Sequence, residues 1–458
     1  MAYLFDILDK YQIRNLKARC DAVLTPFDLL PLLPSEIILI IFDYIEICDL
    51  RGFLLVSKAW NRRLCSPSVL HAAVLRSHPR EQSELANSSC ANLLRRIQRI
   101  DNFRRGDWTY QRAASEEYDP VPYSELSDRQ MQDVISYSWP KLASIQTLGS
   151  EESINLATFT KHDRFRTEIY YGDDRESFYH VKCSPTLLIA ISIMSKCYVW
   201  DHVKNKPVHI FKIEPGVIAA TDVSDNAVVI LQQHPLRVTT WSMKTRKVRQ
   251  FQIPSADEEE YQCHELLIEP ANTTFIHFVR NPSSCFAVRF SLTGLSIAYS
   301  IWDHCPQQDD EDNISFSQNN TVQRQPKDKY IVWSIIDHED WAEHSALYLI
   351  KFDPTAFQFS LKFVDLGCRS VHLHSCMILY DRIQMIYCPR IDREEIEWVL
   401  EWIDFEGRTI GEVEELSGDW HLLFGDERLL LHKSNKSFRL RWFDGLSLEK
   451  TESKPIAS

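Results

Sequence analysis

The fold of most of the chain is decided by a pattern that is clearest in residues 187–213, LLIAISIMSKCYVWDHVKNKPVHIFKI. Three short runs rich in aliphatic, β-branched and aromatic residues alternate there with polar turns: Leu187–Ile193, Cys197–Trp200 and Val208–Ile213. Runs of about four to eight such residues, bounded by turn-forming residues, are typical of β-strands. The stretch therefore predicts three consecutive strands.

The same unit recurs through the C-terminal two-thirds of the chain, where the middle runs end at residues 200, 241, 290, 352, 403 and 442. The last two units include the runs Thr409–Val413 and Leu446–Lys450, and most units have a weaker fourth run before the first. Four short strands in every ~40–50 residues are typical of a β-propeller blade. We count six units, and residues 140–176 are expected to supply a seventh unit or a closing strand. Residues 141–458 are therefore predicted to form an all-β domain, a β-propeller of six or seven blades, with a large β-sandwich as the alternative.

One long interval between units holds a polar, acidic tract, residues 305–328, which we interpret as an inserted mobile loop. Asp309–Asp312 in this tract, the His/carboxylate cluster of residues 337–344, and the alternating pair His372 and His374 are the candidates for metal or acid–base chemistry. None of them matches a known ligand spacing, and we find no hydrolase or nucleotide-binding motif. Solvated loops and structural histidines are the preferred interpretation, and no catalytic residue, metal or cofactor is predicted.

Composition indicates a globular protein of two or three domains: 458 residues, of which 44% are hydrophobic and 25% charged. The net charge of −13 lies entirely in residues 151–458, since residues 1–150 hold 18 basic and 18 acidic side chains. An acidic surface repels phosphate groups, so binding to nucleic acids or to anionic membranes is not expected. The twelve cysteines show no CxxC pair, and the N-terminus has no signal peptide, so we expect an intracellular protein in the cytoplasm or nucleus with reduced thiols.

The N-terminal residues 29–75 predict three short helices. The first contains Ile37–Phe42, six consecutive apolar residues that would surround a helix on every side. Asp49 would cap a second helix, on which Phe53, Val56, Trp60 and Leu64 share one stripe, and Ser66-Pro67 would begin a third. A module of this size cannot bury so much apolar surface. The surplus covers either the rest of the chain or another protein, and periodicity alone leaves both open.

The same residues resemble the F-box motif. The matching string is Leu33-Pro34-x-Glu36-Ile37-x-x-x-Ile41-Phe42-x-Tyr44-Ile45, followed by Asp49-Leu50, Val56-Ser57-Lys58-x-Trp60 and Pro67. Leucine is more common at the position of Ile45, which is a conservative departure. The resemblance spans about a tenth of the chain.

The resemblance implies a three-helix domain that docks on the Skp-type adaptor of cullin–RING ubiquitin ligases. Carried over by position, it makes Leu33, Pro34, Ile37, Ile41 and Leu50 the adaptor-binding candidates. It leaves Phe42, Val56 and Trp60 as the core of the F-box itself.

The flanking segments are predicted as an N-terminal helical extension at residues 1–28 and a helical linker at 76–140. Within the linker, residues 85–105 have an apolar stripe and many arginines, which we interpret as a helix that packs its stripe on a neighbouring domain. Residues 102–108, NFRRGDW, weakly resemble the stretch that leads into the propeller of F-box/WD-repeat proteins.

Tryptophans divide into two groups by their position in the repeat. Four recur at equivalent ends of strands and are predicted to pack between blades: Trp200, Trp241, Trp402 and Trp442. Trp302, Trp341 and Trp420 lie outside that register and are candidates for contact with a target protein.

The favoured hypothesis is thus a non-catalytic substrate-recognition subunit of a Skp–cullin–F-box ligase, whose propeller holds a protein target. The alternatives are an F-box scaffold outside ligases, and a propeller hydrolase or oxidoreductase with an incidental helical cap.

Overall fold

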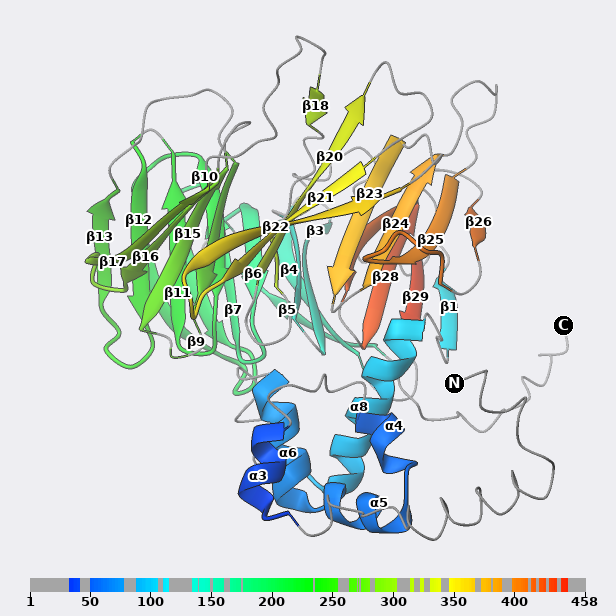
Figure 1. Cartoon of the computed structure of the whole chain (residues 1–458). Helices are drawn as coiled ribbons and strands as arrows, with labels where there is room; N and C mark the ends of the chain where they lie inside the picture. Colours follow the sequence, from blue (N-terminus) through cyan, green and yellow to red (C-terminus); the bar gives the residue numbers. More distant parts are fainter. Residues whose placement is uncertain are drawn as a thin grey trace, which may run out of the picture. The chain divides into compact units, whose positions relative to one another are not determined.

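The computed structural model of the chain is shown in Figure 1. It describes residues 33–41, 50–77, 88–105, 110–114, 134–138, 140–148, 151–159, 165–173, 176–233, 235–253, 263–269, 271, 273–280, 285–302, 314–316, 322–324, 330–338, 346–366, 372–379, 382–388, 398–410, 413–416, 420–425, 428–434 and 438–443. Contacts divide the chain into two compact units. The N-terminal unit comprises residues 1–77 and 81–101, and the C-terminal unit comprises residues 78–80 and 102–458. The predicted extension at 1–28 lies outside the described residues.

The N-terminal unit is helical. Its described helices are α3 (Ser35–Ile41), α4 (Leu50–Leu54), α5 (Lys58–Leu64), α6 (Pro67–Ser77) and most of α8 (Cys90–Arg105). Pro67 occupies the first position of α6, where its missing N–H costs no helical hydrogen bond. The predicted third helix is confirmed, because the apolar residues at its helical spacing are all buried: Val69, Leu70, Ala73 and Val74.

Helix α8 confirms the predicted amphipathic helix within residues 85–105, beginning at Cys90. Its N-terminus is capped by Ser89, whose hydroxyl oxygen accepts a hydrogen bond from the Asn92 N–H at 3.3 Å. Leu93, Ile97 and Ile100 form a stripe whose side chains are no more than 1% exposed. Helix α8 therefore buries one apolar face, although it carries many arginines.

The C-terminal unit is all-β, as predicted. Its described residues form seven antiparallel sheets, six with four strands and one with five. The strands are β1 (Tyr110–Ala114), β2 (Ile135–Ser138), β3 (Lys141–Leu148), β4 (Glu151–Phe159), β5 (Phe165–Tyr170), β6 (Phe178–Cys183), β7 (Leu187–Ser192), β8 (Lys196–Asp201), β9 (Lys206–Lys212), β10 (Ile218–Val223), β11 (Ala227–Gln232), β12 (Arg237–Ser242), β13 (Val248–Gln252), β14 (Cys263–Ile268), β15 (Thr274–Arg280), β16 (Cys285–Ser291), β17 (Ser296–Trp302), β18 (Ile314–Phe316), β19 (Val322–Arg324), β20 (Tyr330–His338), β21 (Ala346–Asp353), β22 (Gln358–Asp365), β23 (His372–Leu379), β24 (Arg382–Cys388), β25 (Trp398–Asp404), β26 (Glu414–Leu416), β27 (Trp420–Gly425), β28 (Leu429–Ser434) and β29 (Phe438–Trp442).

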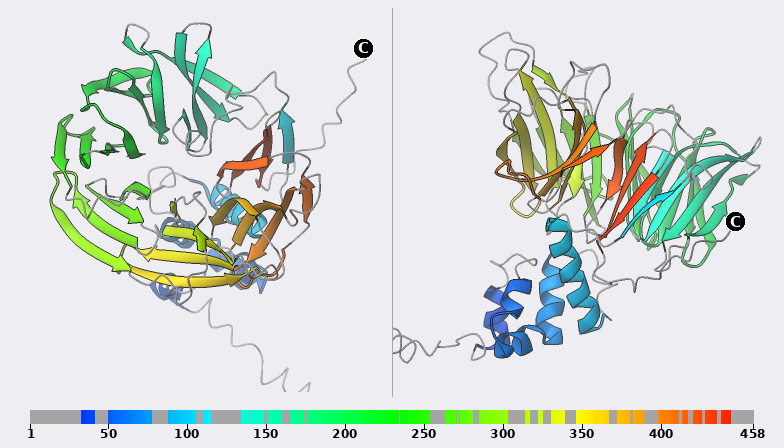
Figure 2. Two further views of the ribbon diagram at one scale, coloured as in Figure 1. Left: turned by 90° about the horizontal axis from the view of Figure 1, so that it is seen from above. Right: turned by 90° about the vertical axis from the view of Figure 1, so that its right-hand side faces the viewer.

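Each sheet is built from strands that follow one another in the sequence, such as β6–β9 and β10–β13. The runs of residues 187–213 are β7, β8 and β9. Burial falls from the middle strands to the last one, since β7 is buried throughout and β9 is mostly exposed. Seen from above, the sheets follow one another around a common centre with their last strands on the outside (Figure 2).

One sheet departs from this sequential order. β1 pairs antiparallel with β29, from Tyr110 opposite Trp442 to Ala114 opposite Phe438. The order β1-β29-β28-β27 thus joins the beginning of the unit to its end. The prediction of a helical linker over residues 76–140 is wrong at this point and at β2. The short run of β1 has little apolar pattern of its own, and its partner lies more than 300 residues away in the sequence.

Two further predicted segments differ in detail. Of the run Thr409–Val413 the structure describes residues 409, 410 and 413; Thr409 follows a tight turn after β25 and forms an isolated antiparallel bridge with Ile403, and the strand that follows is β26. The acidic tract 305–328 contains two short strands, β18 and β19, which both pair with β20. The run Leu446–Lys450 lies outside the described residues.

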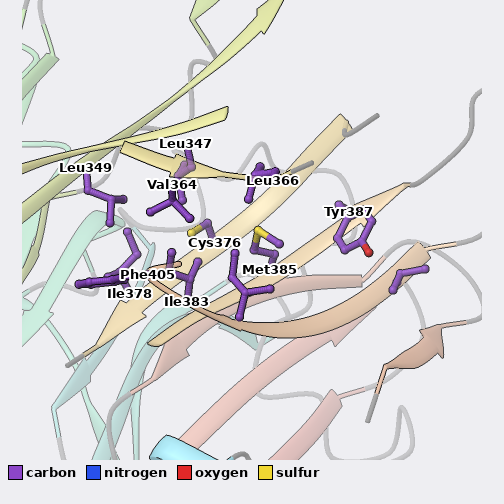
Figure 3. Close-up of a cluster of buried hydrophobic side chains, with 12 residues drawn as sticks. Leu347, Leu349, Val364, Leu366, Cys376, Ile378, Ile383, Met385, Tyr387 and Phe405 are labelled. Carbon is purple, nitrogen blue, oxygen red and sulfur yellow. The ribbon is translucent and has the colours of Figure 1, made fainter. Parts of the chain in front are cut away.

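The core lies between neighbouring sheets. In Figure 3, Leu347, Leu349 and Val364 of sheet β18–β22 pack against Cys376 and Met385 of sheet β23–β26. The predicted role of three tryptophans is confirmed, because each is buried in a cluster that joins two neighbouring sheets: Trp200, Trp241 and Trp402. The side chain of Trp442 is outside the described part of the chain.

The first residues of the C-terminal unit are anchored in such a cluster. Phe103 is fully buried, with its ring 5.1 Å from Trp402 and 5.1 Å from Phe443, in edge-on geometry to both. Beside it, the Asn102 amide donates a hydrogen bond to the carbonyl of Phe443 at 3.5 Å. These contacts hold the entry to the unit against its last two sheets.

Candidate functional site

The helix α3 presents apolar side chains to solvent. Ile37 is 41% exposed and Ile40 is 52% exposed, whereas Ile38 is fully buried. Positions three apart lie side by side on a helix, so Ile37 and Ile40 share one face. The carbonyl of Pro34 accepts hydrogen bonds from the N–H groups of Ile37 and Ile38, at 3.1 and 3.2 Å, which begins the helix directly after Pro34. We call Ile37 and Ile40 the α3 pair.

The backbone just before α3 is held by a hydrogen bond from another helix. The Arg63 guanidinium of α5 donates a hydrogen bond to the carbonyl of Leu33 at 2.8 Å. Leu33 and Ile41 are half-buried and Pro34 is exposed. Of the residues predicted to bind an adaptor, Leu33, Pro34, Ile37 and Ile41 therefore lie on or immediately before α3 and are at least partly accessible.

Leu50 differs from the prediction of a partner-facing residue. Its side chain is fully buried at the start of α4, so it belongs to the core of the N-terminal unit in this structure. Periodicity could not distinguish an apolar residue that faces a partner from one that faces its own module.

The predicted second helix is broken in two, which corrects the assignment of Val56. Ser57 adopts an extended backbone, with φ −156° and ψ 162°, and its hydroxyl oxygen accepts a hydrogen bond from the Trp60 N–H at 3.1 Å. Ser57 is thus the N-cap of α5, and Leu55 and Val56 lie in the turn before it. Because this turn removes Val56 from the helical stripe, its side chain is 59% exposed, and that of Leu55 is 80% exposed.

Trp60 contributes to packing within the N-terminal unit. It is half-buried and stacks on Phe53 of α4, with ring centroids 5.9 Å apart and an interplanar angle of 25°. Phe42, the remaining residue predicted for this core, lies outside the described residues.

Sequence reasoning missed Ile40 and Leu55 as exposed apolar residues. The signal for Ile40 was its spacing of three from Ile37, and the signal for Leu55 was its position just before a capping serine. Exposed aliphatic groups at the start of one helix and at a turn between two others are features of a protein-docking surface rather than of a catalytic site.

The candidates for chemistry in the C-terminal unit are not assembled into a site. A bulge at His374 interrupts the pairing of β23 with β24, so the strand alternation that would put His372 and His374 on one face is broken there. The 337–344 cluster is described only at its first two residues, at the end of β20, and Asp309–Asp312 is not described. Over the described ranges, no group of three or more His, Cys, Asp or Glu side chains is arranged to hold a metal ion.

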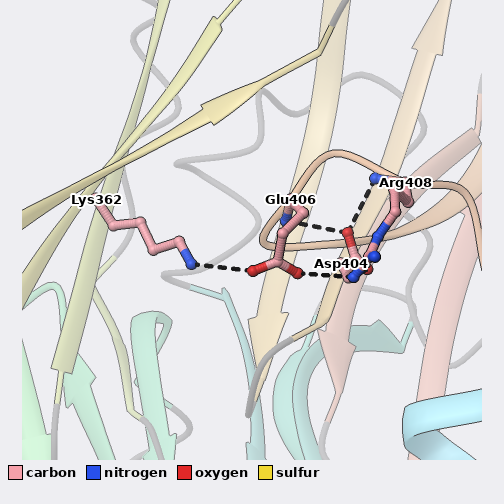
Figure 4. A network of polar contacts seen from close by, with 4 residues as sticks. All are labelled: Lys362, Asp404, Glu406 and Arg408. Carbon is pink, nitrogen blue, oxygen red and sulfur yellow. Dashed lines mark hydrogen bonds and ion pairs between the residues drawn. The ribbon is translucent and has the colours of Figure 1, made fainter. Parts of the chain in front are cut away.

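The polar networks of this unit connect sheets. In Figure 4, Lys362 of β22 forms an ion pair with Glu406 at 3.6 Å, and Arg408 pairs with Asp404 at 2.7 Å. Burial alone would raise the pKa of the Asp404 carboxyl, but hydrogen bonds from the side chain and backbone of Arg408 hold this pKa below its usual range. The network fixes the turn after β25 beside the neighbouring sheet.

A buried histidine pair lies between β14 and β15. The Nδ1 of His264 is 3.2 Å from the Nε2 of His277, and the two rings stack with centroids 5.3 Å apart. Burial, reinforced by the neighbouring His264, lowers the pKa of His277 to about 3. His277 is therefore a neutral, inaccessible group at physiological pH.

The candidate tryptophans for target contact are placed only in part. Trp302 is the last residue of β17 and Trp420 the first of β27, while Trp341 lies outside the described residues. Their assignment stays a prediction.

Comparison with known proteins identifies the helical module. Residues 30–71 match the F-box domain family. No curated protein matches the chain. Among solved structures, the chain is similar to BamB from Moraxella catarrhalis at 9% identity, over 67% of this chain and 95% of that chain, with a TM-score of 0.39. None of the described helices is both long enough and apolar enough to cross a bilayer.

Proposed function

We propose that this chain, which carries an F-box domain at residues 30–71, is the substrate-recognition subunit of a Skp–cullin–F-box ubiquitin ligase. An F-box domain suggests an adaptor role in ubiquitin ligation generally, and F-box proteins are generally non-catalytic. The observation that carries the proposal is that α3, which lies within the matched residues, exposes the apolar side chains of Ile37 and Ile40.

The C-terminal unit is proposed to be a seven-bladed β-propeller that binds the target. Seven sheets among the described residues support this assignment, and in all but the one that contains β1 the strands follow one another in the sequence. The pairing of β1 with β29 supports a ring closed by the two ends of the unit. A closed ring has no terminal blade whose apolar face would be left uncovered.

The adaptor-docking surface is proposed to consist of Leu33, Pro34, Ile41 and the α3 pair. These residues provide neighbouring aliphatic groups on α3 and directly before it. Burial of apolar surface in an interface contributes about 25 cal/mol per Å² to binding. The turn residues Leu55 and Val56 are proposed as a second contact.

The chain would act by proximity rather than by chemistry. Holding a target and the ligase core on one chain raises the effective concentration of the target's lysines near a charged ubiquitin-conjugating enzyme. Trp302, Trp341 and Trp420 are proposed to contribute to binding the target.

The test is a pull-down of a purified Skp-type adaptor by the full chain. We expect Ile37→Asp/Ile40→Asp to reduce the retained adaptor at least tenfold, because two charges would be buried in an apolar interface. The matched control is Ile169→Asp, which alters an isoleucine of similar exposure (49%) on β5. Equal retention by wild type and the double variant would show that the α3 pair is not the docking surface.

Addition of cullin to the same pull-down distinguishes a ligase subunit from a scaffold outside ligases. A ligase subunit retains cullin through the adaptor, and the double variant loses both proteins together. Retention of adaptor without cullin would instead favour the scaffold.

A further inference from the structure

The strand β17 is an edge with an apolar, solvent-exposed row of side chains. Within the described residues, it pairs only with β16 and ends its sheet. Leu295, just before the strand, is 71% exposed, and the alternating residues Ile297, Tyr299 and Ile301 are 56%, 58% and 43% exposed. Tyr299 and Ile301 alternate along the strand and therefore point to one face. Ile297 lies at a bulge, since Phe290 pairs with Ser296 and Arg289 with Ala298, and it adds a third exposed apolar side chain beside them.

No other last strand of a described sheet has this composition. β17 reads SIAYSIW and has no charged residue. The strands in the equivalent position all carry at least one: β1, β5, β9, β13, β22 and β26. Charged side chains on an edge strand prevent pairing with other chains, and β17 lacks this protection.

The edge is held in place by its surroundings. Gly294, in the turn before β17, has φ +94°, and a Cβ at this position would lie 2.9 Å from the ring of Phe251. The Thr240 hydroxyl donates a hydrogen bond to the carbonyl of Leu292 at 2.8 Å, which ties the same turn to the sheet β10–β13. A fixed strand loses little conformational entropy when another strand is added to it.

Charge determines which occupant suits this edge. An added strand would place its central residues against an uncharged row, where an unpaired charge would lose its hydration without compensation. The ends of the added strand would lie in the field of a unit whose residues 151–458 carry a net charge of −13, which favours basic flanks. A second copy of the chain brings the same negative charge and is repelled.

We propose that β17 binds an extended segment of a partner protein by strand addition, and that this segment alternates neutral and aliphatic or aromatic residues between lysine or arginine flanks. The identification of this partner as a ligase target rests on the proposed function. The backbone groups on the edge of β17 that is unpaired among the described residues supply the affinity, and the exposed side chains of Ile297, Tyr299 and Ile301 supply the selection of side chains.

The test uses the full chain and a fluorescent peptide probe, Lys-Lys-Ile-Thr-Val-Thr-Ile-Lys-Lys, in a polarisation titration. We expect saturable binding, and at least a tenfold weaker dissociation constant for Ile297→Lys/Ile301→Lys, which adds like charge to the edge. The matched control, Ile169→Lys/Ile210→Lys, changes isoleucines that are 49% and 39% exposed on β5 and β9 and should bind within twofold of wild type. Hydrogen exchange should show slower exchange of β17 amides when the peptide is bound.

Four results would overturn the proposal. They are an absence of saturable binding, equal binding by the β17 double variant, equal binding of a peptide whose backbone amides are N-methylated, or equal binding of a glutamate-flanked peptide. A chain that dimerises in sedimentation, and loses the dimer in the β17 variant, would assign the edge to a second copy and would also overturn the proposal.

Adaptor retention is measured on the same proteins. An unchanged adaptor pull-down with no peptide binding refutes strand addition alone, whereas lost adaptor binding by wild type refutes the proposed function.

Discussion

Replacement of Phe103 by alanine tests how the entry to the C-terminal unit is held. The side chain is fully buried among residues from β23, β25, β28 and the segment after β29. Both of its close aromatic neighbours, Trp402 and Phe443, would face the space that the phenyl ring leaves. The variant therefore weakens the packing between the last two sheets without touching any exposed residue.

The expected magnitude follows from these contacts. Truncation of a buried phenylalanine to alanine costs about 3–5 kcal/mol. This range already includes the lost contacts with neighbouring rings, and the two aromatic pairs of Phe103 place the expected cost near the middle of it. We expect Phe103→Ala to lower the free energy of unfolding of the C-terminal unit by about 4 kcal/mol.

Site-resolved hydrogen exchange under denaturant measures this loss. Amides of β28 and β29 that exchange only through global opening should exchange on the order of 1000-fold faster, since about 1.4 kcal/mol corresponds to a factor of ten. Phe53→Ala is the control, because Phe53 packs against Trp60 in the N-terminal unit and should leave these amides unchanged. A change below tenfold in Phe103→Ala would refute the anchoring role.

Three further predictions concern local features. Ser57→Ala removes the cap that accepts a hydrogen bond from Trp60 and should cost about 1 kcal/mol, seen as roughly fivefold faster exchange of the α5 amides; unchanged exchange would contradict the cap. Gly407→Ala should lower the melting temperature in calorimetry, because φ is +76° and a Cβ would collide with the carbonyl oxygen of Asp365. A positive φ alone costs about 1–2 kcal/mol, and an unchanged melting temperature would refute this turn geometry. His277 should make the protein less stable in acid, because the unfolded state binds a proton below pH ~6.5 while the folded state stays neutral down to about pH 3. The free energy of unfolding should therefore be highest above pH ~6.5 and fall between these two pH values by up to about 1.4 kcal/mol per pH unit. In denaturant titrations, His277→Leu should reduce this pH dependence, and an equally steep dependence in the variant would contradict the assignment.

The candidate docking surface could be predicted only in part from the sequence. The resemblance to the F-box motif made Ile37 a partner-facing candidate, and its side chain is 41% exposed, whereas periodicity alone left open which surface it covers. The difference in exposure between Leu50 and Val56 could not be predicted from the sequence. Leu50 is fully buried at the start of α4, whereas Val56 is 59% exposed because it lies in the turn before the capping residue Ser57. Both are aliphatic residues of the same predicted module.

The local features of this protein can be predicted from its amino acids alone: the short strands of residues 187–213 and their repetition, the helical module at the N-terminus, and the excess negative charge of the C-terminal part. These depend on periodicity and composition within a few residues. The three-dimensional arrangement was needed to see that Tyr110–Ala114 pairs with β29, the last strand among the described residues, and that β17 is an edge strand with exposed apolar side chains. Pairing between segments hundreds of residues apart, and the exposure of one strand among many similar ones, depend on which surfaces the folded sheets leave uncovered.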